Sequence, residues 1–182
     1  MHDSRRLVTR GVYRFRQFWQ AIWAGPLTEQ SRQEIAAVLD EEQLALFLTQ
    51  SEDGQQHSYR VMQKLVEAGH DQDELLVAAL LHDVGKYRRR YTWLDRVKVV
   101  LTQRLGPKWA VKWANGPSNW WTRAYIVKAN HPAWGAEALA QAGGSELSVA
   151  LVRRHQELDP GPVGKNEEDR LLALLQWADD QS

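Results

Sequence analysis

A histidine and an aspartate, His82 and Asp83, directly follow the apolar run LLVAALL at residues 75–81. If a helix continues through them, both side chains lie on faces that carry apolar residues, so we expect them to point toward the core. A buried carboxylate without a partner is costly, and a bound metal ion would remove that cost. The alternative is a histidine favoured by the dipole at the C-terminus of a helix, beside an exposed aspartate.

Three other histidines and one aspartate could belong to the same site. His57 and His155 lie at helical spacing from apolar residues, and His131 precedes the proline at which we expect a helix to begin. Asp179, rather than its neighbour Asp180, lies on the apolar face of the last helix. Each of them also has a structural interpretation, as a hydrogen-bonded core histidine, a helix cap or a solvated residue. Imidazole and carboxylate ligands without thiolate suit Fe, Mn, Zn or Co better than Ca.

The order of these residues resembles the HD superfamily of metal-dependent phosphohydrolases. The segment LLHDVGK at 80–86 is similar to the HDIG variant of the family motif, with Val84 in place of the usual Ile. HPAWGAEAL at 131–139 resembles the run that carries the next ligand, and QWADD at 176–180 resembles the closing segment. The paired histidines and the GYP triplet of the HD-GYP branch are absent around His155, which argues against cyclic-di-GMP as the substrate. The resemblance covers residues 54–180.

This resemblance implies two divalent transition-metal ions bridged by Asp83. It implies hydrolysis of a phosphoester or phosphoanhydride bond by a metal-activated water, in a nucleotide or a cyclic dinucleotide. Both a phosphodiesterase and a nucleotide hydrolase fit this description. The implied ligands form two groups that share Asp83: His57, His82 and Asp179 for one ion, and His131 and His155 for the other.

Two cationic residues near the motif are candidates for contact with the substrate. Lys86 lies three residues after Asp83, so it could project toward the site, bind a substrate phosphate and act beside Asp83 in catalysis. The alternative is a lysine favoured by the helix dipole alone. Arg60, one turn after His57, is a further candidate for substrate binding. The sequence contains no GxxxxGK[ST] phosphate loop, so a nucleotide triphosphatase of that class is not expected.

Helices have to position these residues, because apolar residues recur with a helical period and no run alternates as a strand does. Thr28, Asp40 and Asn166 are expected N-caps, Asp71 or Asp73 opens the helix before His82, and Gly69 ends the helix that carries His57. The expected helices span 5–24, 28–39, 41–50, 54–68, 72–84, 92–105, 108–114, 119–129, 132–142, 145–156 and 167–180.

These helices predict an all-α fold, and the length of 182 residues suits a single domain. We expect one HD-type helical bundle over 1–182, with N-terminal helices in 1–52, the HD core in 54–180 and a Trp-rich basic insertion at 87–129. The chain has no cysteine, which excludes disulfides and thiolate ligands. No apolar run is long enough for a transmembrane segment and the N-terminus does not resemble a signal peptide, so a cytoplasmic location is expected.

The insertion combines tryptophans with positive charge. Residues 86–128 contain eleven Lys and Arg and a single acid, Asp95, although the net charge of the chain is zero. The tryptophans could pack a helical subdomain, form a lid over the substrate, or contact a membrane surface. The expected partner is a phosphorylated small molecule, with peripheral membrane contact as a second candidate. An alternative function is a non-catalytic, metal-binding HD fold whose basic aromatic surface binds membrane or nucleic acid.

Overall fold

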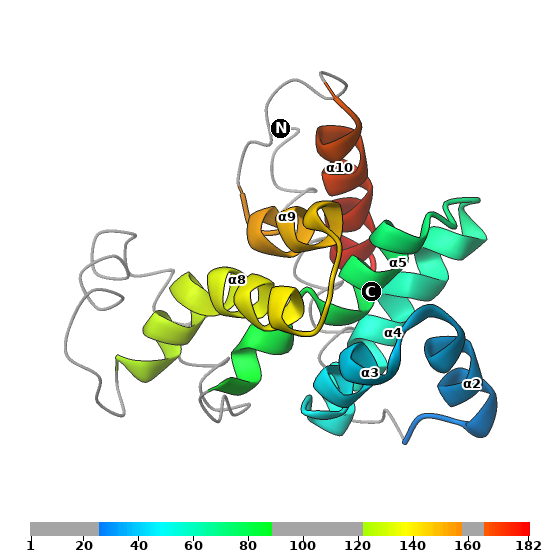
Figure 1. Ribbon diagram of the computed structural model, residues 1–182, viewed down its shortest axis with the longest axis horizontal. Helices are drawn as coiled ribbons and strands as arrows, with labels where there is room; N and C mark the ends of the chain where they lie inside the picture. Colours follow the sequence, from blue (N-terminus) through cyan, green and yellow to red (C-terminus); the bar gives the residue numbers. More distant parts are fainter. Residues whose placement is uncertain (1–25, 89–121, 158–165) are drawn as a thin grey trace, which may run out of the picture.

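The computed structural model describes residues 26–88, 122–157 and 166–182. Within these ranges every regular element is a helix, which confirms the all-α fold (Figure 1). The elements are α2 (Glu29–Val38), α3 (Glu41–Leu48), α4 (Glu52–Glu67), α5 (Asp73–Leu81), the 3-10 helix η1 (Val84–Arg88), α8 (Arg123–Gln141), α9 (Glu146–Arg154) and α10 (Glu167–Asp180).

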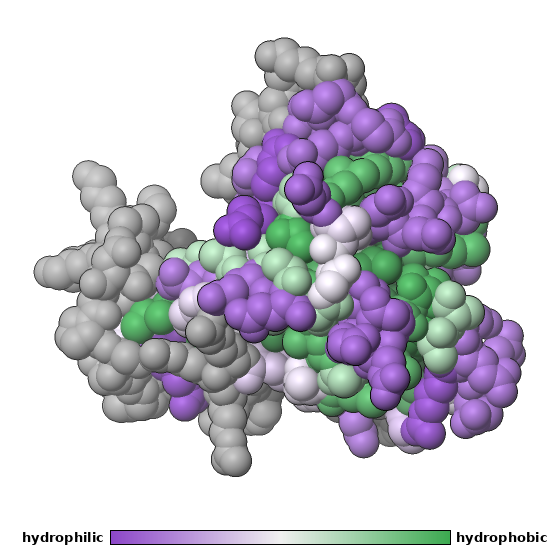
Figure 2. Space-filling model, in the orientation of Figure 1, coloured by the Kyte–Doolittle hydropathy of each residue, from purple (hydrophilic) through white to green (hydrophobic). Residues whose placement is uncertain are grey.

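Helix α5 is the centre of the bundle. Its residues Leu75 to Leu81 are all buried, because helices α2, α3, α4, α9 and α10 pack around it. A helix that is hydrophobic on every side is stable only when it is enclosed in this way. In Figure 2, hydrophilic residues cover much of the coloured surface, and hydrophobic residues are visible between them. The end of α5 therefore delivers His82 and Asp83 into the interior.

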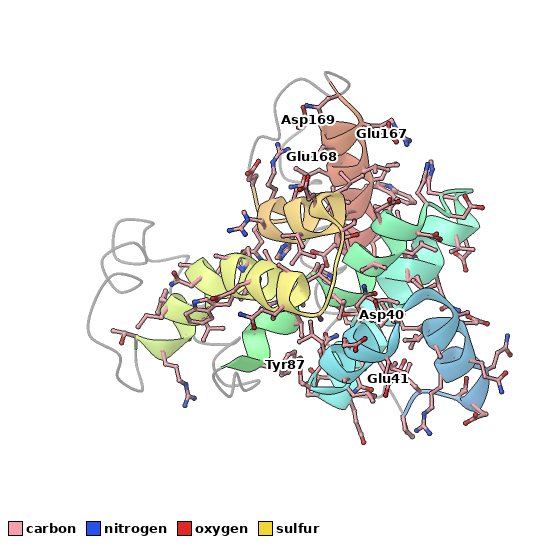
Figure 3. The ribbon with its side chains drawn as sticks, in the orientation of Figure 1. Asp40, Glu41, Tyr87, Glu167, Glu168 and Asp169 are labelled. Atoms are coloured by element: carbon pink, nitrogen blue, oxygen red, sulfur yellow. The ribbon has the colours of Figure 1, made fainter. Side chains whose placement is uncertain are left out.

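Side-chain caps set the starts of several helices. Thr28, Asp40 and Asn166 each accept a hydrogen bond from the backbone amide three residues later, which confirms these expected N-caps. The expectation of Asp71 or Asp73 as the cap of α5 is wrong, because Gln72 occupies that position and makes no side-chain capping bond. Three acids, labelled in Figure 3, fill the first turn of α10, where negative charge is favourable: Glu167, Glu168 and Asp169.

The expected helix 72–84 is too long at its C-terminal end. Helix α5 stops at Leu81, and the chain continues through His82 and Asp83 into η1. The last carbonyls of α5 find side-chain donors: the Gln50 amide donates to Leu80 O at 3.0 Å, and the His82 imidazole lies 2.9 Å from Ala79 O. These bonds replace the helical amides that would otherwise be needed there.

The expected break between two helices at His131 and Pro132 is also wrong. Helix α8 runs without interruption from Arg123 to Gln141 and contains Pro132 in its interior. A proline removes one helical hydrogen bond, the bond to the carbonyl four residues earlier, which here belongs to Lys128. That carbonyl lies 2.9 Å from Nδ1 of His131. The imidazole therefore supplies the hydrogen bond that the proline cannot.

Other expectations concern residues that the structure does not describe. The helices expected at 5–24, 92–105 and 108–114 lie outside the described residues, as does the part of the Trp-rich insertion at 89–121. The single domain over 1–182, the lid and the membrane or nucleic-acid surface therefore stay predictions. In the part of the chain that is described, no helix combines the length and the apolar character that a membrane span requires.

Candidate metal centre

Six histidine and aspartate side chains from distant parts of the sequence converge inside the bundle. They form two groups, and within each group the candidate ligand atoms lie within 4.8 Å of one another. Each residue comes from a different place in the fold shown in Figure 1, apart from the neighbours His82 and Asp83. The first group comprises His57 on α4, His82 after α5 and Asp179 on α10, and the second comprises Asp83 after α5, His131 on α8 and His155 after α9.

The first group is arranged around the carboxylate of Asp179. Its Oδ1 lies 3.0 Å from Nε2 of His57 and 3.7 Å from Nε2 of His82. His82 is fully buried, whereas His57 and Asp179 are partly exposed. Asp180 is exposed, so the structure places Asp179 and not its neighbour in the group. This side of the centre is therefore partly exposed to solvent.

The second group is buried and is arranged around Asp83. Its Oδ1 lies 3.5 Å from Nε2 of His131 and 3.7 Å from Nε2 of His155, and the two imidazole nitrogens are 3.2 Å apart. The other oxygen of Asp83, Oδ2, lies 3.6 Å from Nε2 of His82 in the first group. Asp83 therefore directs one oxygen to each group, which is the position of a bridging ligand.

Backbone carbonyls fix the orientation of the three buried imidazoles. Nδ1 of His82, His131 and His155 lies 2.9, 2.9 and 2.7 Å from the carbonyl oxygen three residues earlier. A carbonyl can only accept a hydrogen bond, so each Nδ1 is the donor. Nε2 of the neutral ring then carries a lone pair directed into the site. This is the arrangement in which a histidine binds a metal through Nε2.

The residues present fit divalent metal ions. Nε2 of His82 is buried and has no hydrogen-bond partner within the described ranges, although buried nitrogens normally have one. Two neutral rings that both donate from Nδ1 would direct lone pairs at each other across the 3.2 Å between His131 and His155. A cation held by both residues would remove this repulsion. Ligand atoms bound at about 2.1 Å in a tetrahedral site lie roughly 3.4 Å apart, close to the distances found here.

The charges of the site favour ionised carboxylates. Burial by itself would raise the pKa of Asp83, but the positive charge of the Lys86 ammonium group beside it holds this pKa well below its usual range. Burial likewise opposes ionisation of Asp179, and its neighbours His57 and His82 lower the pKa of that carboxyl nevertheless. Burial lowers the pKa of His131, which keeps this ring neutral near pH 7. Anionic carboxylates and neutral imidazoles are the forms that bind metal.

The two cationic candidates lie in different settings. The ammonium group of Lys86 contacts Oδ2 of Asp83 and is partly exposed, so it lies at the edge of the site. Arg60 is partly buried on α4, burial lowers its pKa, and its Nε has no hydrogen-bond partner among the described residues. The structure thus places Lys86 on a candidate ligand. Substrate binding by either residue stays a prediction.

Two glycines that bear no ligand atom, Gly85 and Gly135, allow the second group to form. A Cβ on Gly85 would lie 2.0 Å from the carbonyl oxygen of His131 and 2.6 Å from the amide nitrogen of Gly135. Only glycine lets η1 approach α8 so closely, and this approach brings Asp83 to His131. Gly85 follows Asp83 by two residues in LLHDVGK, and Gly135 follows His131 by four residues in HPAWGAEAL. These short spacings are the sequence signal that could have identified the two glycines.

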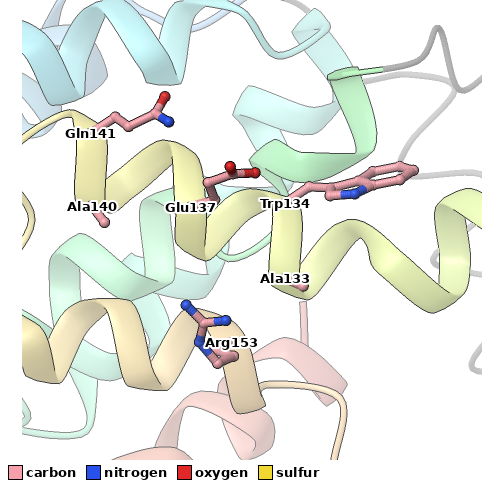
Figure 4. Close-up of a pocket in the computed structure, with 6 residues that line it drawn as sticks. All are labelled: Ala133, Trp134, Glu137, Ala140, Gln141 and Arg153. Carbon is pink, nitrogen blue, oxygen red and sulfur yellow. The ribbon is translucent and has the colours of Figure 1, made fainter.

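A surface hollow elsewhere does not belong to the centre. It has a volume of about 540 Å³ and lies between α8 and α9 (Figure 4). None of the six candidate ligands lines it; the lining residues are Ala133, Trp134, Glu137, Ala140, Gln141 and Arg153. The candidate site is therefore the cluster of histidines and aspartates.

Comparison with known protein families gives a match over most of the chain. The family model of the HD domain matches residues 54–181, which include all six candidate ligands. The chain belongs to the HD domain family. HD domains bind divalent metals and indicate the metal-dependent phosphohydrolase superfamily. Comparisons with curated proteins and with solved structures give no significant match.

Proposed function

We propose that this HD domain is a dimetal phosphohydrolase that cleaves a phosphoester or phosphoanhydride bond of a nucleotide or cyclic dinucleotide. The observation that carries the proposal is the position of Asp83. One oxygen of this carboxylate faces His82, and the other faces His131 and His155. A single carboxylate shared between two sets of imidazoles is suited to two ions and less suited to one.

The six residues would hold two divalent ions of the Fe, Mn, Zn or Co type, because nitrogen and carboxylate ligands suit these metals. When bound, such a pair of ions lowers the pKa of a shared water and stabilises the charge that develops on phosphoryl oxygens. His57, His82, Asp179 and Asp83 would hold one ion. Asp83, His131 and His155 would hold the other.

The chain's own residues prepare the site for an anionic substrate. The carbonyl bonds hold the imidazoles of His82, His131 and His155 in fixed orientations, so little reorganisation accompanies binding. Lys86 is close to Asp83 and partly exposed, and it would bind a substrate phosphate. Arg60 supplies a second cation on the helix that carries His57. The proposed catalytic residues are Asp83 and Lys86.

Metal content measures the ligand assignment directly. Protein stripped with a chelator and reloaded with Mn²⁺ should contain close to two ions per chain. Asp83→Asn keeps the size of the side chain but removes the shared charge, so both ions should be lost; His131→Ala should lose mainly one. The matched control is Asp180→Ala, because Asp180 is exposed beside the candidate ligand Asp179. Wild-type protein that binds no transition metal would refute the proposal.

Hydrolysis is tested next with the loaded protein. Bis(p-nitrophenyl) phosphate and p-nitrophenyl phosphate separate a diesterase from a monoesterase, and a panel of nucleotides and cyclic dinucleotides with phosphate or product detection follows. Turnover by the wild type and its loss in Asp83→Asn are expected. Two bound ions without turnover of any phosphorylated compound would show a binding protein instead.

A further inference from the structure

The three buried imidazoles each make the same kind of hydrogen bond to the backbone. Each ring donates from Nδ1 to the carbonyl oxygen of the residue three positions earlier, at closely similar distances. In a regular α-helix that carbonyl accepts the amide of the residue that follows the histidine. The hydrogen bond to the imidazole is therefore favoured where this carbonyl lacks its usual amide donor. The pairs are Ala79 with His82, Lys128 with His131, and Val152 with His155.

For two of the three histidines the reason is the end of a helix. Helix α5 ends at Leu81 and α9 ends at Arg154, and the residue after each end is the histidine. The last four carbonyls of a helix have no amide donor within the helix, and the carbonyls of Ala79 and Val152 belong to these sets. His82 and His155 therefore find an open acceptor one turn behind them.

His131 lies in the middle of α8, where no helix end provides such an acceptor. Here the residue that follows is Pro132, which has no amide hydrogen. The carbonyl of Lys128, four residues before this proline, is the one that accepts from Nδ1 of His131 at 2.9 Å. The ring also lies 3.1 Å from the carbonyl of Val127, which in a helix accepts the backbone amide of His131 itself.

We propose that Pro132 is a positioning residue for the metal centre: by withholding an amide inside α8, it opens the Lys128 carbonyl that fixes the His131 imidazole. The proposal rests on the dimetal centre proposed above. Pro132 thus does in mid-helix what a helix end does for His82 and His155. Helix α8 can therefore continue past His131 to Gly135, where η1 packs against it.

The test variant is Pro132→Ala, which restores an amide at position 132 and favours the helix. This amide competes with the imidazole for the Lys128 carbonyl. In the metal-free wild type, nitrogen NMR of the imidazoles should show His131 protonated on Nδ1 alone. In the variant we expect a mixture of Nδ1 and Nε2 protonation for this ring, whereas His82 and His155 should be unchanged.

Metal affinity gives the second measurement, with Zn²⁺ as the probe in competition with a chelator. A His57→Ala background weakens the first group, so the remaining ion reports the group that contains His131. Adding Pro132→Ala to this background should lower the Zn²⁺ affinity about tenfold, the lower end of the range for lost hydrogen-bond partners of metal ligands, because the Val127 contact remains. The matched control, Pro26→Ala, removes an exposed proline before α2 and should leave the affinity unchanged.

Thermal unfolding separates positioning from a purely structural role. The metal-free Pro132→Ala protein should unfold at the same temperature as the wild type or a higher one, since alanine is a better helix residue than proline. An unaltered His131 signal with unaltered Zn²⁺ affinity would overturn the proposal. A lower unfolding temperature would overturn it too, if Pro132→Ala lowered the Zn²⁺ affinity equally in a His131→Ala background, where the remaining ion reports the first group. If the wild type binds no Zn²⁺, the proposed function fails, while the NMR comparison still decides the role of Pro132.

Discussion

The Asp83 side chain is almost completely buried, and both of its oxygens face imidazole nitrogens. In the metal-free protein, Lys86 supplies the positive charge that keeps this carboxylate ionised. A bound cation would share or take over that role. Because Lys86 is partly exposed, we propose that its ammonium group would then turn toward a substrate phosphate without leaving the site.

Replacing Lys86 measures this second role. Lys86→Ala should keep the metal content near wild type and lower kcat/KM about ten- to hundredfold, because a lost charge-assisted hydrogen bond costs roughly 1.5–3 kcal/mol. The control Lys64→Ala removes a lysine from the last turn of α4 and should keep full activity. Steady-state kinetics on the best substrate of the panel decide the matter. Full activity in a loaded Lys86→Ala protein would limit this lysine to neutralising Asp83.

The pKa shifts predict how the stability of the metal-free protein depends on pH. Asp83 and Asp179 have folded pKa values below the value of about 3.9 in an unfolded chain, so their stabilisation is present above pH 4 and is lost as the pH falls through the folded values. His131 also has a lowered pKa, so an unfolded chain takes up its proton first, and stability falls below about pH 6.5.

We therefore expect the unfolding temperature of chelator-treated protein to fall from pH 7 to pH 5, and again below pH 4. Circular dichroism melts at a series of pH values measure both steps. His131→Gln carries no titrating ring at this position, so it should reduce the first step and keep the second. An unfolding temperature that is constant, or that rises on acidification between pH 7 and pH 5, would contradict the expected behaviour of His131.

At the scale of elements, the closest approach is that of η1 to α8. The backbone of Gly85 lies against the turn of α8 between His131 and Gly135, and a methyl group at Gly85 would overlap three backbone atoms of these two residues. Backbone atoms of a helix cannot move aside as the end of a flexible side chain can. The distance between Asp83 and His131, and with it the second group of ligands, depends on this contact.

Replacing Gly85 or Gly135 with alanine should change the stability of the protein by very different amounts. Gly85→Ala should destabilise the protein by about 3 kcal/mol, the upper end for overpacking, and weaken metal binding by the second group. Gly135→Ala places its methyl group 3.3 Å from Gly85 N and from Val152, and it gains helix propensity, so its net effect should be within about 1 kcal/mol. Urea unfolding of both variants tests this order. Equal stability of the two variants would show that η1 and α8 can separate freely.

The sequence predicts the helices better than their ends. The helical period of the apolar residues and the capping residues predict the ends of five helices to within a few residues, since local chemistry sets these boundaries. These helices are α2, α3, α4, α9 and α10. The course of the chain at His131 is not predictable in this way, because a proline normally favours a helix start. Here a tertiary role for the imidazole, which bonds to Lys128 O, allows the helix to continue. Likewise α5 ends early because Gln50 and His82 satisfy its carbonyls.

The sequence predicts which residues form the candidate site, but it does not predict their geometry. The order of His57, His82, Asp83 and Asp179, together with the family motifs, predicts which residues converge, and the structure brings them together. Spacing along a chain says nothing of the direction of each carboxylate oxygen. The division of the Asp83 oxygens between the two groups follows from packing among α5, α8 and α9, which no local pattern encodes.

At the scale of the whole molecule, the centre joins five helices. Its ligands come from α4, the end of α5, α8, the end of α9 and α10, so ions bound there would connect the elements that surround the core. Unfolding would separate all of these ligands. Metal binding and global stability should therefore be strongly linked.

Metal removal tests this linkage. At a free metal concentration one hundred times Kd, each ion adds about 2.7 kcal/mol to the free energy of unfolding, so for a chain of this size the two ions together raise Tm by roughly 10–20 °C. We expect this rise for the wild type and for the control Asp180→Ala, and no rise for Asp83→Asn. Calorimetry with and without a chelator measures it. Equal Tm values for loaded and stripped wild-type protein would mean that the ions bind outside this centre.

The two groups of ligands also differ in when they can be completed during synthesis. The last member of the second group is residue 155, whereas the first group waits for residue 179. At elongation rates of about 5–20 residues per second, the ribosome needs on the order of 1–5 s to add the residues between them. Asp83, His131 and His155 therefore leave the ribosome before Asp179 does. During synthesis the buried half of the centre therefore has all of its ligands before the exposed half does, and the arrival of α10 completes the exposed half last.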